Sequence, residues 1–371
     1  MKSLLIIQPY IASYRVPFFE KLVPALSDRG VQCSIAAPLP QGKQALRHDA
    51  VSGAPWHILT QSSTRTFFGV EVQNSVPLGK MMQYDGVITG LAGSSLDAYR
   101  ALWARRWNGT KVGLWGHVGS YVKAGQPVDL ALERLQMRLA DQVFSYTEKG
   151  ANLAIERGVE PERVVSVNNT VSLENVIRAV ENANPETVAD FKSSYALVDG
   201  KVLSFVGGID DTKRIDYLCQ VLDELWNRDR EFKLLVGGRG AEEWRLQPAV
   251  DRGQCVLFGR VDDAAKALIW IASSAMLLPG RIGLVAVEAL AFNLPIFTLE
   301  SEAHAPEAEY LISDESVFYV STSASEAADS ILERCGDMSK LDTSRVRDAS
   351  YPSIDDMVAR FCRGVSSMFD A

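Results

Sequence analysis

The feature that most constrains the fold is an alternation of short apolar runs with longer amphipathic segments, which recurs along most of the chain. Residues 4–7 form an apolar run, and the next segment has hydrophobic residues at helical spacing and ends at Gly30. Further short runs lie at residues 85–89, 112–115 and 142–145, each followed by a turn and then a helical pattern. Alternation of this kind predicts a parallel sheet with helices on both faces.

The same alternation begins again at Lys201, after a polar segment without a clear period at residues 183–200. A chain of 371 residues also exceeds the roughly 100–200 residues of a typical single domain. We therefore predict an α/β protein with two Rossmann-like domains and a cleft between them. The predicted domains are residues 1–185 and residues 195–350, joined by a linker in the polar segment.

The net charge of −8 hides a difference between the two halves of the chain. Residues 1–185 contain 19 Lys and Arg against 15 Asp and Glu, whereas residues 186–371 contain 19 against 31. Because the chain is acidic and has no basic run, we expect no nucleic acid partner. The mildly basic first half favours either contact with an anionic surface, such as the inner face of a membrane, or simply two domains with different surface charge.

The sequence carries no visible targeting signal, membrane span or metal-binding pattern. Its first apolar run is shorter than that of a signal peptide, and no stretch approaches the roughly 20 apolar residues of a membrane span. The five cysteines lack a CxxC pair, and the four histidines lack HxxxH or HxH spacing. We therefore expect a cytoplasmic protein with reduced cysteines and no metal cofactor.

The strongest candidate site lies in residues 277–297, where Pro279 and Gly280 end a predicted strand. Gly283 permits a close backbone approach at the start of the next helix, whose unpaired amides carry about half a positive charge and suit a diphosphate. Glu288 lies about one and a half turns into this helix, where its carboxylate can accept hydrogen bonds from a ribose diol. An ordinary strand–helix turn with a solvated glutamate explains the pattern equally well.

A second candidate loop lies in residues 204–218. Gly207 and Gly208 end a strand there, and Lys213 and Arg214 precede a helix. Cations at this place can balance phosphate charge. The segment is not a P-loop, and the alternative is a basic pair on a helix surface, which fits Arg214 better than Lys213.

Glycine-rich strand ends recur at residues 234–240 and 257–261. Each is a weak signal alone, but four such loops in one half of the chain are more specific. In the first half, the polar loop at residues 8–22 directly follows the first strand, and His117 lies between glycines in residues 115–120. A histidine there suits a ligand-facing loop, although a lone histidine is more often structural.

Several short motifs follow one another along the chain in the order YRVPFF, WGH, FSYT, SVNNTV, FVGG with TKR, LLVGGRG, LFGRV, PGRIGLVAVEAL and HAPEAEYL. In this order the chain resembles the family 4 glycosyltransferases, which are retaining enzymes of the GT-B fold common in bacterial surface-polysaccharide synthesis. The resemblance is most specific in residues 201–310. It implies that the first domain binds the acceptor and the second the nucleotide sugar. It also implies a final helix, in residues 353–371, that crosses back onto the first domain.

The resemblance implies roles for single residues as well. Lys213 would contact the donor diphosphate, Glu288 the ribose and His117 the donor sugar. We predict catalytic roles for His117, Lys213 and Arg281. The predicted donor-binding residues are Gly207, Gly208, Arg214, Gly238, Arg239, Gly259, Arg260, Gly280, Ile282, Gly283, Leu284 and Glu288, of which Gly259 and Arg260 would form the base-binding loop. The predicted acceptor-binding residues are Tyr10, Tyr14 and Arg15.

Two residues depart from the family pattern. The first glutamate of the family's E-x7-E signature falls at Gly280, and an arginine expected after Gly207 is replaced by Gly208. In the family, the missing glutamate touches the transferred sugar and the missing arginine touches the diphosphate. Arg281 or Arg214 would supply the lost positive charge, with Arg239 a weaker candidate.

For the reaction, the resemblance implies front-face attack, in which the acceptor hydroxyl enters on the side that the nucleotide leaves. A departing phosphate oxygen takes the proton, and neither a metal nor a cofactor is required. The expected donor is a UDP- or GDP-sugar. The expected acceptor is a saccharide or a polyprenyl-linked saccharide in bacterial polysaccharide, lipopolysaccharide O-antigen or capsule synthesis.

Two other functions compete with this one. A nucleotide-sugar epimerase shares the GT-B architecture, and Gly280 and Gly208 favour a non-catalytic scaffold protein.

The segment at residues 96–109 combines Trp103 and Trp107 with arginines. This composition suits peripheral contact with the inner membrane, whereas a core-packed helix with a solvated basic face is the alternative.

Overall fold

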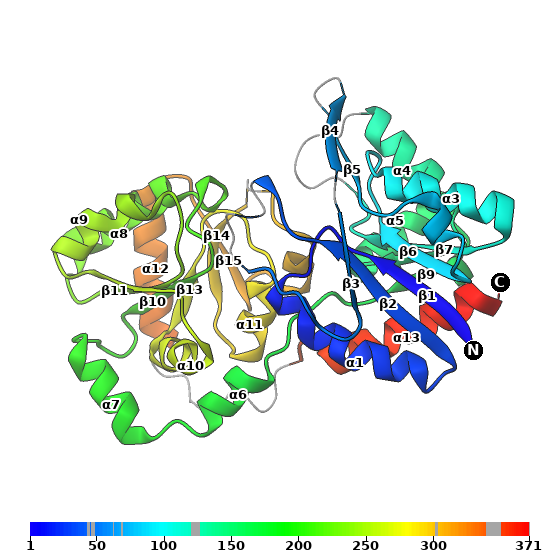
Figure 1. The fold of residues 1–371 in the computed structure, drawn as a ribbon. Helices are drawn as coiled ribbons and strands as arrows, with labels where there is room; N and C mark the ends of the chain where they lie inside the picture. The colour runs from blue at the N-terminus through cyan, green and yellow to red at the C-terminus, as the bar shows by residue number, and fades with distance from the viewer. Residues whose placement is uncertain are drawn as a thin grey trace. The chain divides into compact units, whose positions relative to one another are not determined.

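The structure is a computed structural model. It describes residues 1–42, 45, 49–61, 63–67, 70–119, 127–300, 303–338 and 350–370. The chain divides into two compact units, of which unit 1 comprises Met1–Ser172 with Pro352–Ala371 and unit 2 comprises Leu173–Tyr351. Each unit is built on its own parallel sheet with helices around it (Figure 1). Within the described ranges, no helix is both long enough and apolar enough to cross a membrane.

The sheet of unit 1 is parallel throughout, in the strand order β3-β2-β1-β6-β7-β8-β9. Its strands are β1 (Lys2–Ile7), β2 (Val31–Pro38), β3 (His57–Thr60), β6 (Gly86–Gly90), β7 (Lys111–Gly116), β8 (Gln142–Ser145) and β9 (Val164–Ser166). A separate antiparallel pair is formed by β4 (Ser63–Phe67) and β5 (Val70–Asn74). The helices are α1 (Val16–Ser27), α2 (Leu78–Met81), α3 (Leu96–Asn108), α4 (Pro127–Leu139), α5 (Glu148–Glu156) and α13 (Ile354–Asp370), with short 3-10 turns at η1 (Ser13–Arg15) and η3 (Pro161–Arg163).

The apolar runs become strands because both faces of this sheet are buried. Leu4 and Ile6 of β1 lie in one hydrophobic core, whereas Leu5 and Ile7 lie in another, since successive side chains of a strand point to opposite faces. Helices α1 and α13 contribute to the first core, and α3 and α4 contribute to the second. A strand buried on both faces needs a continuous apolar run rather than an alternating one.

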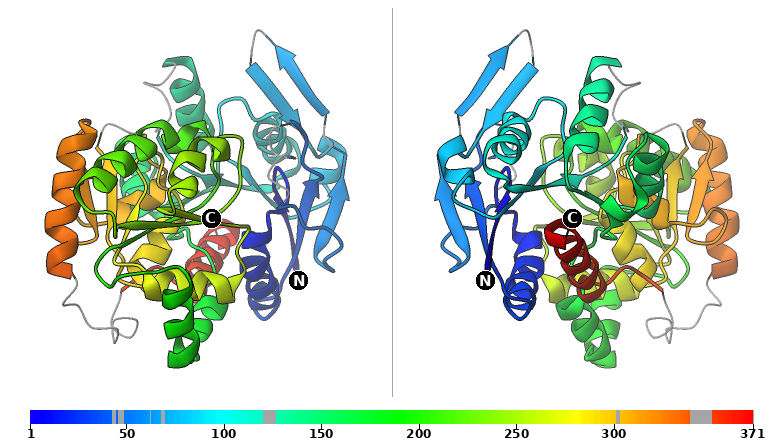
Figure 2. Two further views of the ribbon diagram at one scale, coloured as in Figure 1. Left: turned by 90° about the vertical axis from the view of Figure 1, so that its left-hand side faces the viewer. Right: turned by 90° about the vertical axis from the view of Figure 1, so that its right-hand side faces the viewer.

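Helix α13 completes the core of unit 1 from the far end of the chain. Phe361 is fully buried, and its ring stacks on Phe144 at 4.6 Å and meets the edges of Trp115 and Phe18 at 5.1 and 5.5 Å. Figure 2 shows α13, in red, beside α1, in blue, and the two helices are in contact. Residues from both ends of the sequence therefore share one core.

The boundary between the units does not lie where the sequence analysis places it. Residues 173–185 belong to unit 2, and the polar segment at 183–200 is no linker but holds α7 (Pro185–Ser194). The physical reason is an aromatic cluster that the polar composition conceals. Phe191 stacks on Phe258 at 5.8 Å, and Tyr195 meets the same ring at 5.3 Å, so this segment packs onto unit 2.

The sheet of unit 2 is also parallel throughout, in the order β12-β11-β10-β13-β14-β15. Its strands are β10 (Val202–Val206), β11 (Lys233–Gly237), β12 (Cys255–Gly259), β13 (Ala275–Leu277), β14 (Ile296–Leu299) and β15 (Val317–Val320). Its helices are α6 (Glu174–Glu181), α7, α8 (Ile215–Arg228), α9 (Gln247–Asp251), α10 (Asp263–Ala272), α11 (Val285–Ala291) and α12 (Ala324–Met338), with 3-10 turns η4 (Asp211–Lys213), η5 (Glu243–Leu246) and η6 (Pro306–Tyr310). The strand order reverses between β10 and β13, and sheets of this type bind ligands at that point, beyond the carboxyl ends of the strands.

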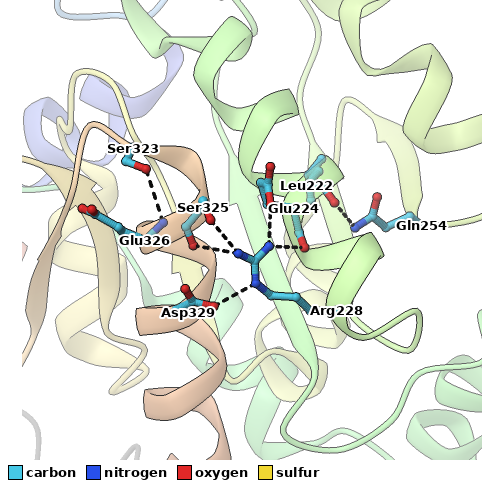
Figure 3. Close-up of polar contacts among 8 residues, drawn as sticks. All are labelled: Leu222, Glu224, Arg228, Gln254, Ser323, Ser325, Glu326 and Asp329. Carbon is cyan, nitrogen blue, oxygen red and sulfur yellow. Dashed lines mark hydrogen bonds and ion pairs between the residues drawn. The ribbon is translucent and has the colours of Figure 1, made fainter.

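A single arginine ties α8 to α12 in unit 2 (Figure 3). The Arg228 guanidinium donates to the Asp329 carboxylate at 2.8 Å and to the Ser325 hydroxyl at 2.7 Å, both on α12. It also donates to the Glu224 carboxylate one turn earlier on α8, at 2.5 Å. These charge-assisted hydrogen bonds fix the relative position of two helices that flank the same sheet.

We predict that Phe361→Ala lowers the free energy of unfolding of unit 1 by about 3–5 kcal/mol, because it removes a fully buried ring and leaves a cavity. Urea denaturation monitored by circular dichroism measures this loss. Ser366→Ala, an exposed position on the same helix, is the control and should unfold like the wild type. Equal unfolding midpoints for the two variants would show that α13 does not complete the core.

Candidate functional site

The loops after β10 and β13 come together at the switch point of unit 2. The backbone N–H of Arg281 donates to the carbonyl of Thr212 at 2.9 Å. The Lys213 ammonium in turn donates to the carbonyl of Arg281. The structure therefore brings together two segments that the sequence analysis selected independently, residues 204–218 and residues 277–297.

Gly280 makes this contact possible. A Cβ atom at this position would lie 2.4 Å from both the carbonyl oxygen of Thr212 and the carbonyl carbon of Lys213, much closer than van der Waals contact allows. No side chain fits on this backbone, so a glutamate at position 280 would push the two loops apart. The departure from the E-x7-E pattern thus has a steric cause within unit 2.

Lys213 and Arg281 place two cations close together. Burial lowers the pKa of Lys213, the Asp210 carboxylate raises it, and the Arg281 guanidinium lowers it further, with the lowering effects larger. A half-buried ammonium beside a second cation is stabilised by an anion. An ammonium has three N–H donors, and the described residues use one of them, on the Arg281 carbonyl, which leaves two for a ligand within that part of the chain.

Arg214 is placed differently from Lys213. Its backbone is left-handed, with φ of 53°, and it caps the N-terminus of α8. Its Nε lies 3.5 Å from the Asp216 carboxylate. This arrangement is that of a helix-surface ion pair, the alternative that the sequence already favoured for Arg214.

Glycine is required at the ends of β11 and β12, at Gly238 by the close approach of another loop and at Gly259 by a left-handed backbone with φ of 67°. A Cβ atom on Gly238 would lie 1.9 Å from the carbonyl oxygen of Gly207, and one on Gly259 would lie 2.9 Å from the Arg239 guanidinium. Arg239 also pairs with Glu243 at 3.5 Å, and its side chain is 65% exposed. Gly208 and Arg260 are exposed at the same edge of the sheet.

The start of α11 differs from the prediction. The helix begins at Val285, so Glu288 lies in its first turn. Several backbone N–H groups around this helix start are used within the protein. Those of residues 281 and 282 donate to Thr212 and to the His304 ring, and those of residues 286 and 287 donate to the carbonyls of Gly283 and Leu284. The N–H groups of residues 283–285 have no hydrogen-bond acceptor among the described residues, so their contact with a diphosphate stays a prediction.

Glu288 is buried and only half satisfied. Its Oε1 accepts from the Lys266 ammonium at 3.0 Å, whereas its Oε2 is buried without a hydrogen-bond partner among the residues that the structure describes. A buried carboxylate oxygen without a donor is costly, and a ligand hydroxyl would satisfy it. The carboxylate is thus held in position and has one acceptor available.

Sequence reasoning missed two residues of this region. Lys266 lies on α10 and holds Glu288; its signal is a lone lysine within an otherwise apolar stretch of that helix. Glu309 lies in η6, which contacts α11. Both of its carboxylate oxygens are buried without a partner in the described part of the chain, and burial raises its pKa to about 7.

In unit 1, the loop after β1 carries the residues predicted to bind the acceptor. The Tyr10 hydroxyl donates to the Asp49 carboxylate at 3.3 Å, and Tyr14 is 39% exposed. Arg15 is buried against aromatic rings.

His117 follows β7 and is half-buried. The segment 115–120 that contains it ends at a residue outside those described. The catalytic role of His117 stays a prediction.

Helix α3 carries an exposed aromatic pair. Trp103 is 57% exposed and Trp107 is 70% exposed, and their rings stack 6.1 Å apart. The helix does pack against the core, as the alternative from the sequence expects, but through Ala98 and Ala101 rather than through the two tryptophans. Arg105 of the same helix instead pairs with the buried Asp141 at 2.9 Å and has a structural role.

Within the described ranges, no group of three or more His, Cys, Asp or Glu residues is placed to hold a metal ion.

The comparisons with known proteins are consistent in fold. Residues 200–337 match the family described as "Glycosyl transferases group 1". A curated relative from Haemophilus influenzae, named "Uncharacterized glycosyltransferase", is 28% identical over 190 residues, which are 49% of this chain and 48% of that protein. The chain thus spans about half the length of the curated relative that it matches.

Three solved structures are similar over nearly their full length. Anabaena Alr3699/HepE in complex with UDP has a TM-score of 0.66 at 12% identity, with 99% of this chain and 100% of that chain covered. A glycosyltransferase from Rickettsia africae has a TM-score of 0.62 at 14% identity, with 100% and 96% covered. UDP-GlcNAc 2-epimerase from Methanocaldococcus jannaschii has a TM-score of 0.60 at 14% identity, with 99% of both covered. The chain therefore has the GT-B fold of two Rossmann-like α/β domains, as the sequence predicted.

Proposed function

We propose that this protein is a glycosyltransferase that moves a sugar from a nucleotide-sugar donor, bound by unit 2, to an acceptor bound by unit 1. The observation that carries the proposal is the buried carboxylate of Glu288, which Lys266 holds on one oxygen while the other has no partner among the described residues. The similarity of residues 200–337 to the group 1 glycosyltransferases supports the same activity.

Glu288 is suited to bind the ribose of the nucleotide. A ribose diol offers two hydroxyl donors, and an ionised carboxylate accepts hydrogen bonds on both oxygens. The ion pair with Lys266 orients the carboxylate. Lys266 is therefore a positioning residue that acts through Glu288.

Lys213 and Arg281 are suited to bind the diphosphate. Both are half-buried, where electrostatic attraction to an anion is stronger than in water. As the glycosidic bond breaks, negative charge grows on the departing phosphate, and cations already in place stabilise that charge. The loop at Gly259 and Arg260 is our candidate for contacts with the base. Arg214 and Arg239 would add positive charge at the rim of the donor site.

The donor that we propose is a UDP-sugar rather than a GDP-sugar. Alr3699/HepE was solved with UDP, with UDP and glucose and with UDP-glucose, and these structures share the fold of this chain. For the reaction we propose front-face attack with retention of configuration and without a metal. In that scheme the protein supplies position and charge, and His117 contacts the donor sugar.

For the acceptor we propose a saccharide or polyprenyl-linked saccharide of bacterial surface-polysaccharide synthesis. Tyr10, Tyr14 and Arg15 are the candidate contacts in unit 1. The exposed Trp103 and Trp107 pair supports peripheral association with the inner face of the cytoplasmic membrane, since aromatic side chains favour the membrane interface.

A nucleotide-sugar epimerase is the second candidate, because UDP-GlcNAc 2-epimerases have the same fold. The two activities are separated by incubating the purified protein with UDP-sugar alone. An epimerase converts the donor to an isomer, whereas a transferase needs an acceptor and otherwise yields only slow hydrolysis. Neither reaction would occur in a scaffold protein.

We predict that Lys213→Ala reduces the turnover of sugar transfer by about 10²–10³-fold, because one donor to the leaving group is lost. Thermal unfolding should change little, since Lys213 is only half-buried. Lys192→Ala, which removes a half-buried lysine paired with Asp199 at 2.6 Å, is the matched control and should retain wild-type turnover. Near-normal turnover in both Lys213→Ala and Glu288→Ala would refute the site.

We also predict that Glu288 distinguishes UDP from 2′-deoxy-UDP. The wild type should bind UDP more tightly, because the buried carboxylate accepts from the ribose hydroxyls, and Glu288→Gln should reduce this preference. Lys266→Met should weaken it as well, through misplacement of the carboxylate. Isothermal titration calorimetry measures both affinities, and an undiminished preference in Glu288→Gln would mean that the ribose lies elsewhere.

A further inference from the structure

Arg15 is a buried cation enclosed by aromatic rings. Arg15 is only 6% exposed. The guanidinium carbon lies 5.2 Å from the ring centre of Tyr14, 5.0 Å from that of Trp115 and 5.7 Å from that of Tyr146. These four residues are called the aromatic cage below.

The guanidinium of the cage has no counter-ion in the described part of the chain. Its Nη1 is buried without a hydrogen-bond acceptor, and the indole Nε1 of Trp115 is likewise buried without one. Neither carboxylate of the neighbouring segments pairs with Arg15 in the described part of the chain. Glu148 pairs with Arg360 at 2.7 Å, and Asp49 accepts from the Tyr10 hydroxyl at 3.3 Å on Oδ2, while its Oδ1 is buried without a hydrogen-bond partner. Cation–π contacts offset only part of the cost of burying an unpaired charge.

The aromatic cage lies at the carboxyl ends of the strands of unit 1, the edge at which open parallel sheets generally bind ligands. Arg15 follows β1, Trp115 is the penultimate residue of β7, and Tyr146 directly follows β8. All of these strands are parallel, so their carboxyl ends meet at one edge. Arg15 also caps the twelve-residue helix α1, whose N-terminal dipole adds positive potential at the same place.

We propose that the aromatic cage binds an anionic group, a carboxylate or a phosphate, on the acceptor. This inference rests on the proposed function and narrows its acceptor to an acidic or phosphate-bearing saccharide. A guanidinium forms paired hydrogen bonds with either group, and the indole N–H of Trp115 offers a third donor. The ring of Tyr14, which is 39% exposed, provides an apolar surface for the sugar itself.

The test is a binding titration of the purified full chain by ligand-observed NMR. The probes are glucuronate for the carboxylate, glucose 6-phosphate for the phosphate, and glucose as the neutral control. Wild-type protein should bind at least one anionic probe more tightly than glucose. Arg15→Met should bind that probe about tenfold or more weakly, because a charge-assisted pair is lost, and should be at least as stable as the wild type, because an unpaired buried charge is removed.

Two further variants make the test specific. Lys213→Ala, in the proposed donor site, should keep the preference for the anion. Arg15→Lys retains a charge without the planar fork, should also bind the anionic probe more weakly than the wild type, and decides the matter if Arg15→Met does not fold.

The proposal is overturned if glucose binds as tightly as both anionic probes, or if the preference survives in the Arg15 variants. It is also overturned if the preference is lost in Lys213→Ala instead. An Arg15-dependent preference in a protein that transfers no sugar would refute the proposed activity and leave the anion site in place.

Discussion

The candidate donor site depends on a contact between two stretches of backbone. The turn at residue 280 lies so close to Thr212 and Lys213 that no side chain fits between them. From this approach follow the hydrogen bond from Arg281 to Thr212 and the one from Lys213 to the Arg281 carbonyl. Two cations from different strand ends, Lys213 and Arg281, are thereby held side by side. Without this contact, the repulsion between their like charges would favour a larger separation.

The same contact explains how the chain departs from the pattern of the family it resembles. A glutamate at position 280 and this loop packing exclude each other on steric grounds. Arg281, one residue further on, then lies beside Lys213 and adds positive charge next to it. The loop thus packs in a way that a glutamate at position 280 would prevent, and the absence of that residue alone is not a sign that the site has decayed.

The sequence allowed the prediction of the two sheets, because their strands are apolar on both faces and alternate with amphipathic helices. It also indicated Lys213 and Glu288, which follow glycines at strand ends. It did not indicate the partner of Glu288, since Lys266 lies on another helix and only the folded chain brings the two together. The boundary of unit 2 was misplaced because Phe191 and Tyr195 are sparse among polar residues, yet they find Phe258 in space.

The position of α13 has a consequence for how the protein is made. Phe361 packs among Phe18, Trp115 and Phe144, so the core of unit 1 is incomplete until the end of the chain is available. During synthesis on the ribosome, unit 2 has all of its residues first and is free to fold, although it comes later in the sequence. The nascent N-terminal half must wait with part of its hydrophobic surface uncovered, and it is the part of the protein most dependent on chaperones while translation continues.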